Sequence, residues 1–134
     1  MSPGTVLLDT GPLVAALARN DHQHARSLDL LTRYIGHCVT SEAVVTEATH
    51  LVRRGGVEPW VVVEALLDAG VPIRGLDPPD QRAASRLMRQ FGTDYADATL
   101  LVLAETLQLR RILTFDRRDF AAVQVGGAPL EIVT

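Results

Sequence analysis

The stretch Thr5-Val6-Leu7-Leu8-Asp9, near the start of the chain, is a short apolar run that ends at an acid. The run Arg111-Ile112-Leu113-Thr114-Phe115 repeats this pattern, because it is followed by Asp116. Short apolar runs of this kind are typical of buried strands. Ligands in open α/β sheets bind beyond the carboxyl ends of the strands, so both acids are candidates for a functional site. Asp9 alone is equally compatible with an ordinary turn or cap after a strand.

Weaker apolar runs predict further strands at residues 37–40, 71–74 and 130–133. Pro72 restricts the second of these to a sheet edge or a strand start, because proline cannot donate a ladder hydrogen bond. Stretches with helical spacing lie between the runs, at residues 13–18, 21–34, 41–54, 58–69, 79–91 and 94–108. Strands that alternate with helices predict an α/β fold with three layers, α/β/α, around a mainly parallel central sheet.

The composition predicts one globular domain over residues 1–134. Hydrophobic residues make up 47% of the chain and charged residues 22%, which excludes a disordered protein. The single cysteine, Cys38, excludes a disulfide scaffold and a cysteine-rich zinc module. No apolar run reaches the roughly 18 residues of a membrane span, and no signal-peptide pattern opens the chain. We therefore expect a cytoplasmic protein without membrane contacts.

The charges constrain the chemistry further. The chain has 16 acidic and 13 basic residues, a net charge of −3, and an isoelectric point near 5.7. This balance is not typical of a dedicated nucleic-acid-binding protein. All 13 basic residues are arginines, which excludes a catalytic lysine or a lysine Schiff base. Arginine still suits phosphate binding, since its planar guanidinium contacts oxyanions through two hydrogen bonds.

Glu47 lies on a face of helix 41–54 that should be buried. It shares the apolar side of this helix with Val44 and Leu51. An ionised carboxylate on a buried face is costly unless it is paired or binds a metal. Glu47 is therefore either an ion-pair partner of His50 or Arg54, or a metal ligand.

The helix at 94–108 contains a similar anomaly. Asp97 shares its face with Leu100 and Leu101, and Asp94 precedes it by one turn. Two neighbouring acids repel each other unless a cation lies between them. Asp94 is equally well explained as the residue that caps the amino end of the helix.

Four acids thus end a strand or interrupt an apolar helix face, namely Asp9, Glu47, Asp97 and Asp116. Clustered carboxylates are the ligands that hard divalent cations such as Mg²⁺ or Mn²⁺ prefer. Such ions can hold a phosphate, activate an attacking water and stabilise a leaving oxygen. The pattern therefore predicts phosphodiester hydrolysis.

Four motifs together carry a resemblance to a known family. They are VLLDTGPLV at residues 6–14, SEAVVTEA at 41–48, DYADATLL at 94–101 and ILTFDRRDF at 112–120. In this order they resemble the PIN-domain family, and most closely the VapC-type toxin ribonucleases of bacterial toxin–antitoxin pairs. The resemblance extends over essentially the whole chain and implies a metal-dependent endoribonuclease that uses Mg²⁺ or Mn²⁺ to cleave RNA.

The resemblance also implies the site residues. By position, the acidic metal site and the catalytic acids correspond to Asp9, Glu47, Asp97 and Asp116, with Asp94 matching an acid found in part of the family. Glu47 would bind a second ion or orient the water. Thr114 matches a hydroxyl that supports the site, and Thr10 would act similarly beside Asp9.

The resemblance further implies two protein partners. A cognate antitoxin would hold the enzyme inactive by filling its acidic groove, and the chain would form a homodimer. The stretch from Trp60 to Leu67 is apolar nearly all round, which predicts a helix that is buried or lies at such an interface.

Three other functions deserve comparison. A phosphoryl-accepting receiver domain also gathers acids at strand ends, but it needs a lysine that this chain lacks. A DNA structure-specific nuclease would share the fold, but such enzymes are larger. A non-catalytic PIN scaffold that only binds RNA or a protein would be expected to lack the acids.

Overall fold

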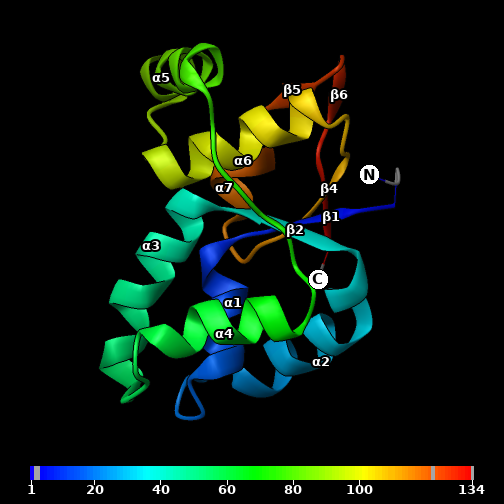
Figure 1. Cartoon of the computed structure of the whole chain (residues 1–134). Helices are drawn as coiled ribbons and strands as arrows, with labels where there is room; N and C mark the ends of the chain where they lie inside the picture. Colours follow the sequence, from blue (N-terminus) through cyan, green and yellow to red (C-terminus); the bar gives the residue numbers. More distant parts are fainter. Residues whose placement is uncertain (2–3, 122, 134) are drawn as a thin grey trace.

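A five-stranded sheet runs through the centre of the molecule in the order β3-β2-β1-β4-β7 (Figure 1). The computed structural model describes residues 1, 4–121 and 123–133, without the side chains of residues 119 and 121. The strands are Val6–Leu8 (β1), Cys38–Ser41 (β2), Ile73–Arg74 (β3), Arg111–Leu113 (β4) and Glu131–Val133 (β7). All neighbouring pairs in this sheet are parallel, which confirms the predicted sheet type.

β1 is central because it is apolar on both faces. All three of its residues are fully buried, as expected for a parallel strand between two helical layers. Leu7 lies opposite Val39 of β2 on one side and opposite Ile112 of β4 on the other. Pro72 precedes the edge strand β3, where a missing backbone donor is tolerated.

Helices cover both faces of the sheet. They are Thr10–Leu17 (α1), His24–Tyr34 (α2), Glu42–Leu51 (α3), Trp60–Asp68 (α4), Pro78–Phe91 (α5), Tyr95–Thr106 (α6) and Arg117–Ala121 (α7). In Figure 1, α5 and α6 lie on one side of the sheet, and α1, α2 and α4 lie on the other. The three-layer α/β/α arrangement is therefore confirmed.

Several boundaries differ from the prediction for local reasons. α1 begins at Thr10, not at Leu13, because Pro12 falls within the first helical turn, where its missing N–H is not needed. α3 ends at Leu51 and passes into the 3₁₀ turn Val52–Gly55. The hairpin of Gln124–Val125 (β5) and Ala128–Pro129 (β6) was not predicted, because two-residue strands carry no readable periodicity.

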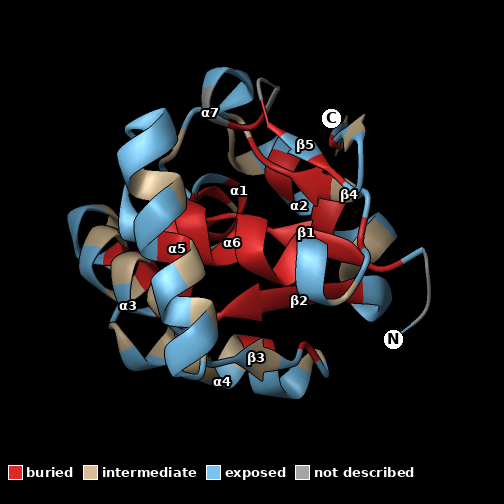
Figure 2. Ribbon diagram, turned by 90° about the horizontal axis from the view of Figure 1, so that it is seen from above, coloured by how far each residue is buried: buried red, intermediate tan, exposed pale blue. Residues whose placement is uncertain are grey.

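α6 is buried on all sides, whereas the sequence predicted a single apolar face. Every residue from Ala96 to Ala104 is buried, and α6 stands out as buried in Figure 2. The second side of α6 is covered by α5, where Ala84 packs against Ala98 and Val102. Small residues at this contact allow the two helices to lie close together.

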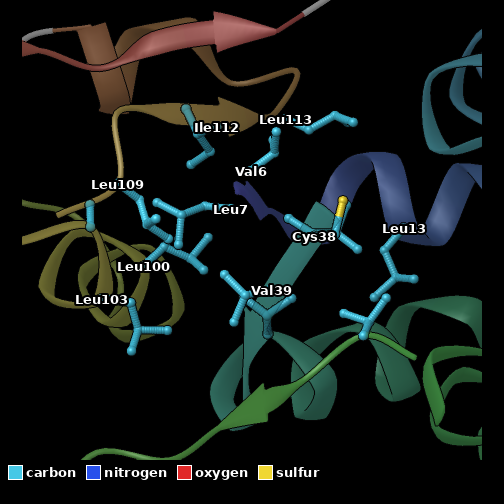
Figure 3. Packing of buried hydrophobic residues seen from close by; sticks show 14 of the residues in the cluster. Val6, Leu7, Leu13, Cys38, Val39, Leu100, Leu103, Leu109, Ile112 and Leu113 are labelled. Atoms are coloured by element: carbon cyan, nitrogen blue, oxygen red, sulfur yellow. The ribbon is translucent and has the colours of Figure 1, made fainter. Parts of the chain in front are cut away.

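The main core lies between the sheet and its helices. Figure 3 shows Leu100 and Leu109 directed toward Leu7 of β1, while Cys38 points to the other side of the sheet with Leu13. Cys38 is a core residue: its thiol donates a 3.3 Å hydrogen bond to the carbonyl of Tyr34. Burial raises the pKa of this thiol to about 11.

α4 is buried on one face only, so of the two predicted alternatives, a buried helix or an interface helix, the fully buried one does not hold. Val62 and Leu66 face the core, but Trp60 is 64% exposed and Leu67 is 59% exposed.

None of the described helices combines the length and the apolar character that a membrane crossing requires.

The core packing predicts a large stability difference between two matched leucines. Leu100→Ala removes a fully buried side chain beneath β1 and should lower the free energy of unfolding by about 2–5 kcal/mol. Leu28→Ala, at an exposed position of α2, should change it by less than about 0.5 kcal/mol. Urea unfolding followed by circular dichroism measures both. Equal losses in the two variants would contradict the assignment of the core.

Candidate active site

Thr114 joins two of the predicted acids at the carboxyl ends of β1 and β4. Asp9 follows β1 directly, and its carboxylate oxygen Oδ2 accepts a 2.6 Å hydrogen bond from the hydroxyl of Thr114. The same hydroxyl accepts a 3.0 Å hydrogen bond from the backbone N–H of Asp116. One hydroxyl therefore fixes Asp9 relative to the loop that carries Asp116.

Asp9 is a carboxylate held in an unfavourable environment. It is only 6% exposed, and burial raises its pKa to about 6. The hydrogen bonds from Thr114 and from the backbone of Thr10 lower this pKa, whereas the negative charges of Glu47 and Asp116 raise it. The acids of α3 and of the segment after β4 thus lie near enough to Asp9 to disfavour its charge.

Glu47 lies at the edge of the buried face of α3. Its side chain is half buried, beside the fully buried Val44 and Ala48. The alternative interpretation, an ion pair with His50 or Arg54, is wrong for the described part of the chain, where the ion pairs lie elsewhere. The negative charge of Glu47 acts instead on Asp9, whose pKa it raises.

Asp94 and Asp97 lie at the start of α6. The Oδ1 atom of Asp94 accepts a 2.8 Å hydrogen bond from the backbone N–H of Asp97, which confirms Asp94 as the amino-terminal cap. Asp94 is exposed, whereas Asp97 is 8% exposed. In Figure 1, the first turns of α1, α3 and α6 lie at the same end of the sheet.

The second predicted supporting hydroxyl behaves differently from Thr114. The hydroxyl of Thr10 is buried and has no hydrogen-bond partner in the described part of the chain. The backbone of Thr10, not its hydroxyl, forms a hydrogen bond with Asp9 and lowers the pKa of that carboxyl.

Asp116, Arg117 and Arg118 are exposed at the beginning of α7.

A buried hydroxyl pair that the sequence analysis missed ties α3 to α6. Ser41 caps α3 by accepting a 3.1 Å hydrogen bond from the backbone N–H of Val44. Its hydroxyl lies 2.8 Å from that of Thr99, which donates in turn to the carbonyl of Ala96 at 2.6 Å. These hydrogen bonds hold α3, which carries Glu47, against α6, which carries Asp97. The one feature of the sequence that could have indicated this hydroxyl pair is Thr99, a polar residue within the apolar run of α6.

The residues present suit a hard divalent cation. No three acidic, histidine or cysteine side chains among the described residues converge into a complete metal cage. Mg²⁺ does not require one, because it keeps several waters and is commonly held by one or two carboxylates. The mutual repulsion around Asp9 is the condition that a bound cation relieves.

Comparison with known proteins gives consistent matches. The family model of the PIN domain matches residues 6–126. Ribonuclease VapC26 of Mycobacterium tuberculosis is 28% identical over 96% of this chain and 99% of its own length.

Among solved structures, the fold is similar to that of VapC20 of Mycobacterium tuberculosis, a toxin that cleaves the sarcin–ricin loop. The TM-score is 0.80 at 18% identity, over 90% of this chain and 97% of that one. A toxin–antitoxin complex from Klebsiella pneumoniae gives a TM-score of 0.68, also at 18% identity, over 97% of each chain. VapBC2 from Rickettsia felis, bound to a DNA fragment from its promoter, gives 0.62 at 15% identity over 97% of this chain and 99% of that one.

The raised pKa of Asp9 predicts how Asp9→Asn alters stability with pH. Between about pH 4 and 6 the folded protein keeps a proton that the unfolded chain has lost, so this group costs stability as the pH rises. In metal-free buffer at pH 7, Asp9→Asn should therefore raise the free energy of unfolding by up to about 3 kcal/mol. This difference in the free energy of unfolding between Asp9→Asn and wild type should disappear near pH 4, where the carboxyl is protonated in the folded protein.

Urea unfolding in EDTA at both pH values measures this effect. Glu105→Gln, at an exposed position of α6, is the matched control and should show no such pH dependence. An Asp9→Asn protein that is less stable than wild type at pH 7 would contradict the account of the buried charge.

Proposed function

The chain belongs to the PIN-domain family, and on that premise we propose that it is a metal-dependent endoribonuclease, the toxin of a toxin–antitoxin pair. The observation that carries the proposal is the hydrogen-bonded arrangement of Asp9, Thr114 and Asp116, with the charge of Glu47 acting on Asp9. The similarity to a curated ribonuclease over nearly the full length of both chains supports the choice of RNA as substrate.

The acids proposed to hold Mg²⁺ or Mn²⁺ are Asp9, Asp97 and Asp116, of which one or two would contact the ion directly and the rest would hold it through its waters. Glu47 would bind a second ion or orient the attacking water. When bound, the cation lowers the pKa of a water and stabilises the oxygen that leaves the phosphodiester. Thr114 holds the Asp9 carboxylate in one orientation. Burial of Asp9 and Asp97 limits access of competing water and strengthens the attraction of both groups for a cation.

Asp94 has a different role in this proposal. Its Oδ1 atom is engaged as a helix cap, so we assign it to the outer layer of the site, where it orients the first turn of α6. Asp97 is the proposed direct ligand, because it is a buried acid in the first turn of α6, and α6 starts at the same end of the sheet as α1 (Figure 1).

The proposed partners follow from the same assignment. An antitoxin would inhibit the enzyme by covering the acidic region. The similarity of the fold to that of a chain in a solved toxin–antitoxin complex supports this partner. A second copy of the chain would cover Trp60 and Leu67, whose exposure on α4 leaves two large apolar side chains in water.

The proposed division between the two acids of α6 gives a direct test of the function. Wild-type protein should cleave single-stranded RNA in Mn²⁺, and EDTA should abolish cleavage. Asp97→Asn should be inactive at every Mn²⁺ concentration. Asp94→Asn can still cap α6, so it should lose about 10–100-fold in metal affinity and recover at high Mn²⁺.

Titration of the cleavage rate with Mn²⁺ separates these outcomes, with single-stranded DNA of the same sequence as the comparison substrate. Recovery of Asp97→Asn but not of Asp94→Asn would reverse the two roles. Cleavage of DNA alone would favour a DNA nuclease, and metal-independent cleavage would overturn the proposed mechanism.

The exposed side chains of α4 predict a dimer that depends on Trp60. Removal of a large aromatic side chain from an interface centre commonly costs about 2 kcal/mol or more, so Trp60→Ala should weaken self-association about 30-fold or more. Leu28→Ala removes an exposed apolar side chain from α2 and should not change it. Light scattering over a concentration series measures both, and a monomeric wild type at micromolar concentration would exclude the dimer.

A further inference from the structure

Three arginines form a stripe along the outer face of α5. Arg82, Arg86 and Arg89 are spaced by four and then three residues, so they lie on one side of the helix, and all three are exposed. The buried Ala84 lies on the opposite side, where α5 packs against α6. In Figure 2, α5 is largely exposed and lies beside the buried α6. These three residues are here called the α5 arginine stripe.

The charge of the α5 arginine stripe is not balanced within its own helix. Asp80 is the one acid of α5, and its helical position places it on the side opposite to the stripe. Within the described part of the chain, none of the three arginines forms an ion pair. Like charges one helical turn apart repel each other and weaken a helix. The stripe therefore has an electrostatic cost that an external anion would relieve.

Other arginines of the chain have partners inside the protein. Arg33 forms an ion pair with Asp29, Arg26 and Arg111 lie over aromatic rings, and Arg110 donates to a backbone carbonyl. These contacts give those arginines a structural role. The α5 arginine stripe differs from them, because its three side chains extend from a helix face that points into solvent.

The α5 arginine stripe has one end near the proposed catalytic acids. α5 packs against α6, and only residues 92–93 separate α5 from Asp94, the cap of α6. Arg89 precedes Asp94 by five residues, so the Cα atoms of these two residues are at most about 18 Å apart. Arg82 lies about 10 Å from Arg89 along the helix axis. A strand whose reacting phosphate lies at the acids can therefore reach the stripe with its neighbouring nucleotides.

The chemistry of this face favours nucleic acid over a protein segment. Ser85 stands between the arginines, and Phe91, the exposed aromatic residue of α5, has a helical position opposite to that of Arg82. A protein segment that docks on a helix buries apolar anchors, which the stripe does not offer. A polyanion needs only the charges, and each guanidinium can contact a phosphate through two hydrogen bonds.

The proposed dimer surface does not compete for this face. α4, which carries Trp60 and Leu67, lies on the other side of the sheet from α5 (Figure 1). Both surfaces can therefore be occupied at once.

We propose that the α5 arginine stripe binds the phosphate backbone of the RNA substrate beside the cleaved bond. This inference rests on the proposed ribonuclease function and adds a substrate-binding surface outside the acidic region. The three arginines are positioning residues, because they contact phosphates that do not react. Such contacts fix the position of a nucleic acid without reading its bases. The stripe also explains how a chain with a net charge of −3 holds a polyanion, since its positive charge is concentrated on one helix face.

The test compares wild type with a triple variant, Arg82→Gln/Arg86→Gln/Arg89→Gln. Binding of a fluorescein-labelled single-stranded RNA of about 12 nucleotides is measured by anisotropy in EDTA over a series of salt concentrations. Loss of three phosphate contacts should reduce the slope of log Kd against log salt by about 2 and weaken binding about 100-fold at about 0.1 M salt. Steady-state cleavage in Mn²⁺ should show a raised KM and a nearly unchanged kcat.

Two further triple variants are the matched controls. Lysine at the same three positions keeps the charge and should keep most of the salt dependence. Arg19→Gln/Arg33→Gln/Arg53→Gln changes the net charge equally at exposed positions outside α5 and should alter the Kd and the salt slope little. Because glutamine suits a helix and its introduction removes the repulsion within the stripe, thermal melts should show the α5 glutamine variant at least as stable as wild type.

The outcomes separate this inference from the proposed function. If wild type cleaves RNA and the α5 glutamine variant keeps its Kd, salt slope and KM, the stripe does not bind the substrate while the ribonuclease function stands. If wild type does not cleave RNA but the variant loses RNA affinity, the stripe binds RNA and the proposed function fails. A labelled poly-glutamate peptide of the same length tests the alternative occupant. If this peptide binds wild type more tightly than RNA does and is lost in the variant, the stripe is a site for an acidic protein and the inference is overturned.

Discussion

The hydrogen bond from Thr114 to Asp9 connects the ends of the two central strands and makes a buried carboxylate tolerable there. Asp9 has been removed from water by the same packing that buries β1, so the core itself generates the unfavourable charge. Without a donor at this point, the carboxylate would bear the full cost of desolvation. The fold and the raised pKa of Asp9 therefore have one origin, the burial of β1 beneath two helical layers.

The remaining acids are placed by helix ends. Ser41 and Asp94 cap α3 and α6, and the Ser41–Thr99 pair locks those ends together. Because a helix turn fixes side-chain direction, setting the start of each helix also sets Glu47 and Asp97. The positive ends of the two helix dipoles face the same region, which partly offsets the repulsion among the carboxylates.

The sequence allowed the sheet type, the layer arrangement and the strand-ending position of Asp9 to be predicted, because short apolar runs before acids are local patterns. It did not reveal the contact between Asp9 and Thr114 by itself, since 105 positions separate them; the role of Thr114 came from family resemblance. The complete burial of α6 was missed because α5 supplies its second covering face. The sequence left open whether α4 is buried or lies at an interface, because an apolar pattern on all sides does not show which side has a partner.

Cys38 gives the central sheet an internal reporter. It is the only thiol in the chain, it lies in β2, paired with β1, and its proton is held tightly by burial. A thiol-directed reagent can therefore react only during openings that expose β2. Reaction rates measured with increasing denaturant would give the free energy of those openings separately from global unfolding. The same measurement with and without Mn²⁺ would show whether cation binding at the end of the sheet stiffens the strands that lead to it.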